Sequence, residues 1–287
     1  MKNSLLQKVF LQEDLNFLLT NRIPRHALTR FMGWYSKIDN PWLTRMGIWV
    51  WRHFTDLDLS EAKPQRYRSL HACFTRELKE GARPIDPRAD VLTSPCDAIV
   101  GEFGTVKGKT IYQAKGYPYA VNELFGSTQS TDEFDEGIFV TLRLTSAMYH
   151  RFHAPTNLTV NHVTFIAGDT WNVNPIALKR IERLFCKNER AVIRCTTERG
   201  HPVAIVPVAA ILVASLRLKF VKDLLNQGYR GEQEIPCDAT YRKGEEMGWF
   251  EHGSTIILFL PKGFEFRHDL KTGQIIRMGQ SLAIQPR

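Results

Sequence analysis

Three polar spots in the sequence carry residue types that can do covalent chemistry, and each lies in strand-like surroundings. Asp97 directly precedes an apolar run, and His150 and His153 lie three residues apart. Ser254 follows Gly253 and leads into a second apolar run. An Asp, a His and a Ser can together activate a hydroxyl for attack on a carbonyl. No further ligands accompany the two histidines at a recognisable spacing, so we expect no metal site.

The surroundings of Ser254 differ from those of a common serine hydrolase. That class places its nucleophile in a G-x-S-x-G elbow, and the residues around Ser254 do not form one. A hydrolase that uses Ser254, His153 and Asp97 is therefore an alternative. Taken singly, each spot also has an ordinary explanation as a turn cap, half of a metal site or a turn into a strand.

Short segments along the chain resemble, in the same order, those of the phosphatidylserine decarboxylase family. They cover residues 83–86, 94–97, 149–155, 185–190, 243–248 and 253–255, and the ending at 276–283 is also similar. The resemblance extends in detail over roughly residues 60–287. The N-terminal part resembles the membrane-binding segment of the bacterial, prokaryotic type I-like members. Ordered segments over this length are far more specific than a lone Gly-Ser-Thr.

This resemblance implies an inactive proenzyme that cuts itself between Gly253 and Ser254. The products would be a β chain of residues 1–253 and an α chain of residues 254–287. Asp97, His153 and Ser254 would form the self-processing set. His153, oriented by Asp97, would remove the hydroxyl proton of Ser254, which would then attack the Gly253 carbonyl.

The resemblance also implies the cofactor and the reaction. Ser254 would become a covalent pyruvoyl group, whose ketone condenses with the serine headgroup amine and withdraws electrons as carbon dioxide leaves. Phosphatidylserine would thus become phosphatidylethanolamine. The family pattern assigns reprotonation of the resulting carbanion to the neighbourhood of His150. The partners implied are phosphatidylserine in an anionic membrane, the two chains of one precursor and a second αβ unit in a homodimer.

Residues 1–55 combine positive charge with aromatic side chains. The chain has a net charge of +8, and this segment holds eight basic and three acidic residues with four of the six tryptophans. Proline positions, with Asn40 as an N-cap, predict helices over 4–20, 25–37 and 41–54. Basic and aromatic residues on short helices suit a membrane interface, although the rings could instead pack on the rest of the protein. No sequence feature indicates nucleic-acid binding.

The apolar runs, the N-terminus and the cysteines predict a peripheral protein on the cytoplasmic side of the cell membrane. The longest apolar run, 203–214, is too short to span a bilayer, and the polar N-terminus does not match a signal peptide. The five cysteines are scattered and form no CxxC pair, which is typical of reduced thiols.

The pattern of elements predicts an α+β fold, with a mainly antiparallel β catalytic body behind a helical appendage. We expect a membrane-association segment over 1–57 and a catalytic domain over 58–287. A helix is predicted at 60–78. The predicted strands cover 98–103, 137–144, 158–165, 191–196, 203–213, 254–260 and 274–278.

Two departures from the family pattern stand out. His252 occupies a position where most members have leucine, and Ala209 and Ala214 replace glycines. The added methyl groups could crowd a pocket wall. We expect processing to survive the change at His252, and the two departures favour a shifted lipid preference or a slower enzyme. A processing-defective paralogue that binds lipid is a separate, second alternative to the decarboxylase.

Overall fold

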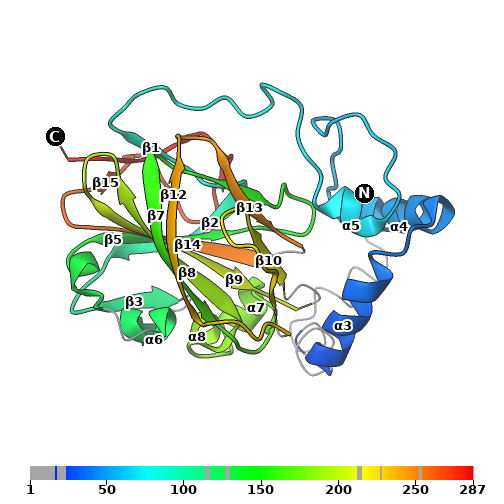
Figure 1. Cartoon of the computed structure of the whole chain (residues 1–287), viewed down its shortest axis with the longest axis horizontal. Helices are drawn as coiled ribbons and strands as arrows, with labels where there is room; N and C mark the ends of the chain where they lie inside the picture. Colours follow the sequence, from blue (N-terminus) through cyan, green and yellow to red (C-terminus); the bar gives the residue numbers. More distant parts are fainter. Residues whose placement is uncertain are drawn as a thin grey trace.

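An eight-stranded antiparallel sheet forms the centre of the protein in the computed structural model (Figure 1). The structure describes residues 17, 24–113, 117–126, 130–211, 215–226, 228–251 and 254–286. The predicted helix at 4–20 therefore lies outside the described residues, apart from residue 17. The strands of the sheet are, in spatial order, β12 (Glu234–Tyr241), β7 (Leu158–Ile166), β8 (Arg190–Thr197), β9 (Pro202–Ala209), β14 (Ser254–Leu260), β5 (Ile138–Arg143), β2 (Ala98–Thr105) and β16 (Ile275–Ile276).

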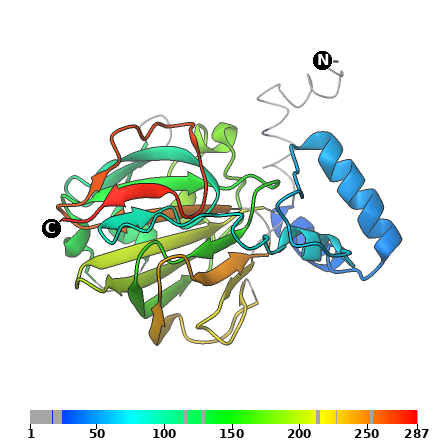
Figure 2. The same cartoon turned by 90° about the horizontal axis from the view of Figure 1, so that it is seen from above.

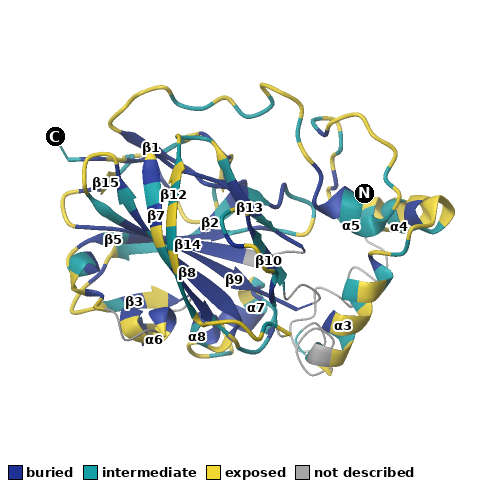
Figure 3. Cartoon of the chain, in the orientation of Figure 1, coloured by how far each residue is buried: buried dark blue, intermediate teal, exposed yellow. Residues whose placement is uncertain are grey.

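Both faces of this sheet are covered. Along β14, Ile256 and Leu258 belong to one buried cluster, while Ile257 and Phe259 belong to another, as the alternation of side chains in a strand requires. The central strands are accordingly buried in Figure 3. Because β14 faces a core on each side, its sequence is a continuous apolar run. These antiparallel sheets and few helices confirm the predicted α+β class.

Smaller elements form the two cores with the central sheet. A four-stranded sheet contributes Phe152, Leu216, Met247 and Phe250 to the first core; its strands are β11 (Leu225–Asn226), β10 (Ser215–Leu218), β13 (Glu246–Phe250) and β6 (Arg151–His153). A three-stranded sheet adds β1 (Val91–Thr93), β17 (Ser281–Ile284) and β15 (Glu265–Phe266). The second core includes residues of the hairpin β3 (Thr110–Gln113) and β4 (Tyr117–Ala120), and of α6 (Val121–Phe125), η2 (Asp132–Phe134), α7 (Pro175–Leu178) and α8 (Leu184–Lys187).

The N-terminal helices lie to one side of the β body, and α4 extends away from it (Figure 2). They are α3 (Arg25–Tyr35), α4 (Pro41–Phe54) and α5 (Leu70–Phe74). Asn40 caps α4, because its side-chain oxygen accepts hydrogen bonds from the backbone N–H groups of Trp42 and Leu43. The predicted helix at 41–54 and its cap are confirmed, and the one at 25–37 ends at Tyr35. No helix in the described ranges is long and apolar enough to cross a membrane.

The predicted helix at 60–78 is wrong, since only α5 is helical there. The backbone N–H of Lys63 donates to the carbonyl of Glu77, and that of Lys79 donates to the carbonyl of Glu61. These bonds close the segment into a loop. Pro64 lacks a donor and disfavours a helix through this stretch. The helical tendency of this segment, which would place apolar residues on one face, is overridden by backbone pairing between its two ends.

Strand β9 also ends earlier than predicted, at Ala209 rather than at 213. The side-chain amide of Asn188 donates to the carbonyl of Ala209 at 2.8 Å, so a side chain takes the place of a further strand partner. Ala214 lies outside the described residues. The division of the chain at 57/58 stays a prediction.

Candidate active site

Ser254 is the first residue of β14, at one edge of the central sheet. The next residue, Thr255, pairs with Arg143 of β5, and Arg143 pairs with Ile99 of β2. Asp97 lies two residues before Ile99. Since neighbouring strands are about 4.8 Å apart, Asp97 and the start of β14 lie at the same edge, about two strand spacings from each other.

Backbone hydrogen bonds bring the histidine segment to this edge. The N–H of His153 donates to the carbonyl of Pro95 at 2.8 Å, two residues before Asp97. The N–H of Phe250 donates to the carbonyl of His150 at 3.0 Å, and Phe250 ends the strand that precedes β14. The fold therefore gathers the segments that carry the predicted site residues. His252 and Gly253 lie outside the described residues.

Asp97 is buried, and its carboxylate is bound by two groups that were not predicted from the sequence. Its carboxylate forms a buried ion pair with Arg83 at 2.5 Å and accepts a second hydrogen bond from the same guanidinium. The backbone N–H of Met278 donates to it at 2.9 Å. Within the described part of the chain, Asp97 and His153 form no hydrogen bond with each other. In this structure, therefore, the His153 ring is not oriented by a direct hydrogen bond to the Asp97 carboxylate.

His153 is positioned by two other groups. Its Nδ1 lies 2.9 Å from the carbonyl oxygen of Gly244, and its Nε2 lies 3.0 Å from the hydroxyl of Tyr149. Because a carbonyl oxygen can only accept a hydrogen bond, Nδ1 carries the proton. Nε2 of the neutral ring then accepts a hydrogen bond from the Tyr149 hydroxyl. Burial lowers the pKa of His153 and outweighs the opposing bond to Gly244. A neutral imidazole with a directed lone pair is suited to act as a general base.

His150 occupies a different environment. It is fully buried, and its ring centroid lies 3.9 Å from that of Phe74 in α5. Trp51 of α4 stacks on the ring of Phe74, with 5.8 Å between the two ring centroids. His150 immediately precedes β6, so it is outside the regular alternation of that strand. A row of aromatic rings thus connects an N-terminal helix to the catalytic body.

An apolar cavity of about 680 Å³ lies between the N-terminal helices and this sheet edge. Leu144 and Ala210 line it, and each directly follows the last residue of a strand that neighbours β14. Its remaining lining residues are Met32, Tyr35, Ser36, Met46, Gly47, Val50, Trp51, Leu70, Phe74, Arg143, Thr145, Ser146, Asn172, Val173, Asn174 and Ile211. The cavity therefore reaches from the ends of the two strands that flank β14 to the helices α3 and α4.

Ion pairs fix the helices that form one wall of this cavity. Lys37 pairs with Glu251 at 2.8 Å, and His71 lies 3.6 Å from the same carboxylate. Burial acts to raise the pKa of Glu251, but the hydrogen bonds from His71 and Lys37 lower it to about 2. Arg25 of α3 pairs with Asp169 at 2.6 Å. The ion pair between Lys37 and Glu251 joins the N-terminal helices to the segment just before residue 252.

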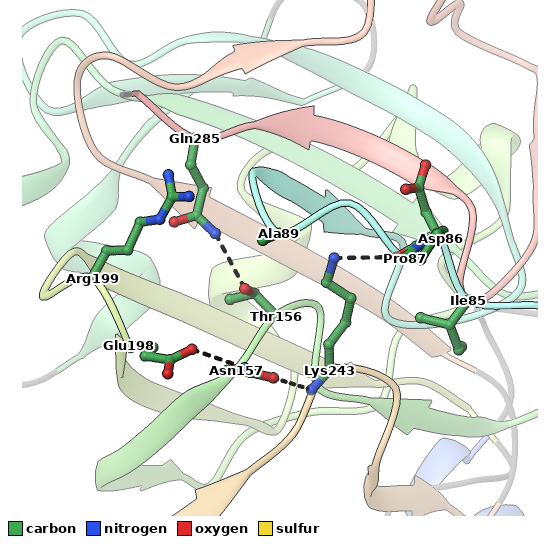
Figure 4. Close-up of a pocket in the computed structure, with 10 residues that line it drawn as sticks. All are labelled: Ile85, Asp86, Pro87, Ala89, Thr156, Asn157, Glu198, Arg199, Lys243 and Gln285. Carbon is green, nitrogen blue, oxygen red and sulfur yellow. Dashed lines mark hydrogen bonds between the residues drawn. The ribbon is translucent and has the colours of Figure 1, made fainter.

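A second cavity, of about 430 Å³, lies at the other end of the sheet. Figure 4 shows the residues that line it. Glu198 and Arg199, which line it, lie in the turn between β8 and β9, whereas β9 meets Ser254 at its opposite end. Its polar groups largely bind each other: Asn157 donates to Glu198 at 2.8 Å, and the Lys243 ammonium donates to two backbone carbonyls. The apolar cavity beside β14 is thus the candidate substrate pocket.

Four side chains of this site were not predicted from the sequence. Arg83 and Tyr149 fall inside the segments that resemble the family, but their types alone suggested no role. Arg143 and Phe74 lie outside those segments. The one available signal was the charge of Arg143 at the end of an otherwise apolar strand.

The family model described as phosphatidylserine decarboxylase matches residues 70–284. The chain belongs to this family. It is therefore an enzyme of the lyase class, as the resemblance implied. The N-terminal helices α3 and α4 lie outside the matched range.

Individual members of the phosphatidylserine decarboxylase family match over nearly their full length. A phosphatidylserine decarboxylase proenzyme from Saccharophagus degradans is 32% identical over 281 residues, covering 95% of this chain and 98% of the relative. The proteins of the same name from Vibrio parahaemolyticus and Brevibacillus brevis are 36% and 34% identical, each covering 92% of this chain and 96% of the relative. These matches include the N-terminal helices.

Proposed function

We propose that this protein decarboxylates phosphatidylserine to phosphatidylethanolamine through a pyruvoyl group made from its own Ser254. Membership of the family and the names of the relatives support the reaction. The assignment of residues is supported by the backbone pairings and hydrogen bonds that bring the segments of Asp97 and His153 to the sheet edge where β14 begins. The apolar cavity beside them suits a diacyl lipid.

Self-cleavage would use His153 as the base. Its Nε2 takes the hydroxyl proton of Ser254, while the oxygen attacks the Gly253 carbonyl and the peptide nitrogen leaves with a proton. The Ser254 hydroxyl must replace Tyr149 at Nε2 or pass its proton through it. Loss of the α-proton then breaks the Cβ–O bond of the ester and releases Gly253 with a free carboxylate. One water hydrolyses the remaining enamine, and ammonia departs.

The position of residue 254 suits a covalent cofactor that remains on the α chain. Ser254 pairs with Ala209, and Thr255 pairs with strands on both sides, so this chain end stays in the sheet after a cut. The pyruvoyl group supplies a ketone that accepts the substrate amine and the electrons released with carbon dioxide. We assign His150, at the same edge, to hold the proton that replaces the lost carboxylate.

The N-terminal helices would bind the surface of an anionic membrane on its cytoplasmic side. Trp34, Trp42 and Trp49 are each at least 64% exposed, and Phe31 and Phe54 are also exposed. Trp51 differs from them because it stacks inward on Phe74. Exposed indole rings beside arginines match the chemistry of a headgroup layer. The division into domains at 57/58 and a homodimer of αβ units belong to the same proposal.

Membrane binding is expected to depend on α4. Changing Arg45 and Arg52 to alanine should weaken binding to anionic liposomes by about 2 kcal/mol, roughly 30-fold, since each basic side chain near such a surface contributes about 1 kcal/mol. Changing Trp42 and Trp49 to alanine should also release the protein. Liposome sedimentation measures both effects. Ile275, an exposed apolar residue of the β body, provides the matched control; equal losses from Ile275→Ala would contradict this role of α4.

The decisive test of the function is the purified protein itself. Denaturing electrophoresis should show two chains, the smaller one comprising residues 254–287. Its mass should be lower by one ammonia than that of the same peptide beginning with serine. Phosphatidylserine in mixed micelles should yield phosphatidylethanolamine, and Ser254→Ala should abolish both results. An intact wild-type chain that binds liposomes without turnover would indicate a lipid-binding paralogue, and labelling of Ser254 by a fluorophosphonate would indicate a hydrolase.

A further inference from the structure

Arg143 is the one charged residue among the described residues that line the apolar cavity. It ends β5 and pairs across the sheet with Thr255, next to the position of the proposed cofactor. Arg143 is partly buried as a residue. Its guanidinium forms no hydrogen bond or ion pair within the part of the chain that the structure describes. Other arginines of the protein that are equally buried have partners, as Arg83 has in Asp97.

A guanidinium that lines an apolar cavity without a protein carboxylate beside it can bind an anionic ligand through charge-assisted hydrogen bonds. Burial alone lowers the pKa of Arg143, since no nearby carboxylate opposes the effect. Arginine has five N–H donors in a planar fork that fits the two free oxygens of a phosphate diester. The site therefore has the charge and the geometry for an anion, and its apolar lining indicates that the anion belongs to a lipid.

We propose that Arg143 binds the phosphodiester of the phospholipid substrate and so sets the position of its headgroup. This inference rests on the proposed function. The phosphodiester lies between the serine headgroup and the glycerol that carries the acyl chains. Arg143 likewise pairs through its backbone with Thr255 of β14 and lines the same cavity as Met32, Met46 and Trp51. An arginine on the phosphate would direct the amine toward residue 254 and the acyl chains toward α3 and α4.

The carboxylate of the serine headgroup is the other anion that Arg143 could bind, and the chemistry disfavours it. Decarboxylation removes the charge of that carboxylate as carbon dioxide forms. An ion pair with it would stabilise the ground state more than the transition state and would slow the reaction. A phosphate keeps its charge throughout, so binding it carries no such penalty.

The test compares substrate and product, which differ only in the carboxylate. Soluble dihexanoyl phosphatidylserine, dihexanoyl phosphatidylethanolamine and dihexanoylglycerol are titrated into the uncut Ser254→Ala protein by calorimetry. Arg143→Met should weaken binding of both phospholipids by roughly 10- to 100-fold, the range for hydrogen bonds to charged groups, and leave dihexanoylglycerol unchanged. Arg143→Lys should give an intermediate loss. Arg199→Met, at the distant cavity, should change none of the three.

Loss of phosphatidylserine binding alone would assign Arg143 to the carboxylate and overturn the proposal, as would unchanged binding of both phospholipids. Arg143→Lys keeps the charge and tests the site even if Arg143→Met does not fold. In the cut enzyme, Arg143→Met should raise KM by the same factor as the dissociation constant. Because the titrations need no turnover, they separate the two proposals: a wild-type protein that lacks decarboxylase activity but binds phosphate through Arg143 overturns the function and not the site.

Discussion

His153→Ala is expected to leave the 287-residue chain uncut. The variant lacks the imidazole whose Nε2 would accept the hydroxyl proton of Ser254, and loss of a general base typically slows a reaction 10²- to 10⁴-fold. Electrophoresis of protein made at neutral pH and followed over days measures the rate. His201→Ala is the matched control, because His201 lies near the turn between β8 and β9, at the far end of the sheet. Cutting of His153→Ala at the wild-type rate would remove His153 from the mechanism.

The pH dependence of self-cleavage is a second test of His153 as the base. The neutral form of His153 is the base, so cleavage is lost as the pH falls through its pKa. Burial lowers this pKa, and the acid limb should therefore have its midpoint below the ordinary histidine value of about 6.5. Tyr149 donates to the unprotonated Nε2 and so favours the neutral ring. Tyr149→Phe should move the midpoint upward, a shift that a merely structural role of the hydroxyl would not produce.

Asp97→Asn is expected to lower the free energy of unfolding by about 3–5 kcal/mol, because it leaves the buried Arg83 without its closest carboxylate. It should also prevent cutting if the carboxylate itself is needed. Arg83→Met is the matched control, since it leaves Asp97 unpaired and should destabilise the protein by a similar amount while retaining the carboxylate. Urea unfolding measures stability, and electrophoresis measures cutting.

The two variants separate a chemical role of Asp97 from a structural one. We expect Arg83→Met to be cut and Asp97→Asn to remain intact at equal stability. If both are cut equally slowly, Asp97 acts only through the fold. The double variant should cost less stability than the sum of the two single changes, because the two side chains contact each other.

Local sequence predicted those parts of the fold whose signals are local. The apolar run from Ile256 to Leu260 predicted a buried strand, and Asn40 before Pro41 predicted the start of α4. The predicted helix at 60–78 was wrong because the bond from Lys63 to Glu77 joins residues far apart in that segment. The two-residue strands β11 and β15 were missed, since so few residues show no periodicity, whereas β16 lies within the predicted strand at 274–278.

By itself, the sequence determined the chemical inventory and the family. Asp97, His150, His153 and Ser254 stand in ordered segments whose residue types and order are properties of the chain, independent of its folding. Only the tertiary structure decided which atoms meet. Gly244, which fixes the proton of His153 on Nδ1, lies 91 residues away along the chain. Arg143 acquires its place in an apolar cavity only when α3 and α4 lie opposite the end of β5. Side-chain hydrogen bonds and burial depend on packing between segments that are distant in the sequence, which local residue patterns do not specify.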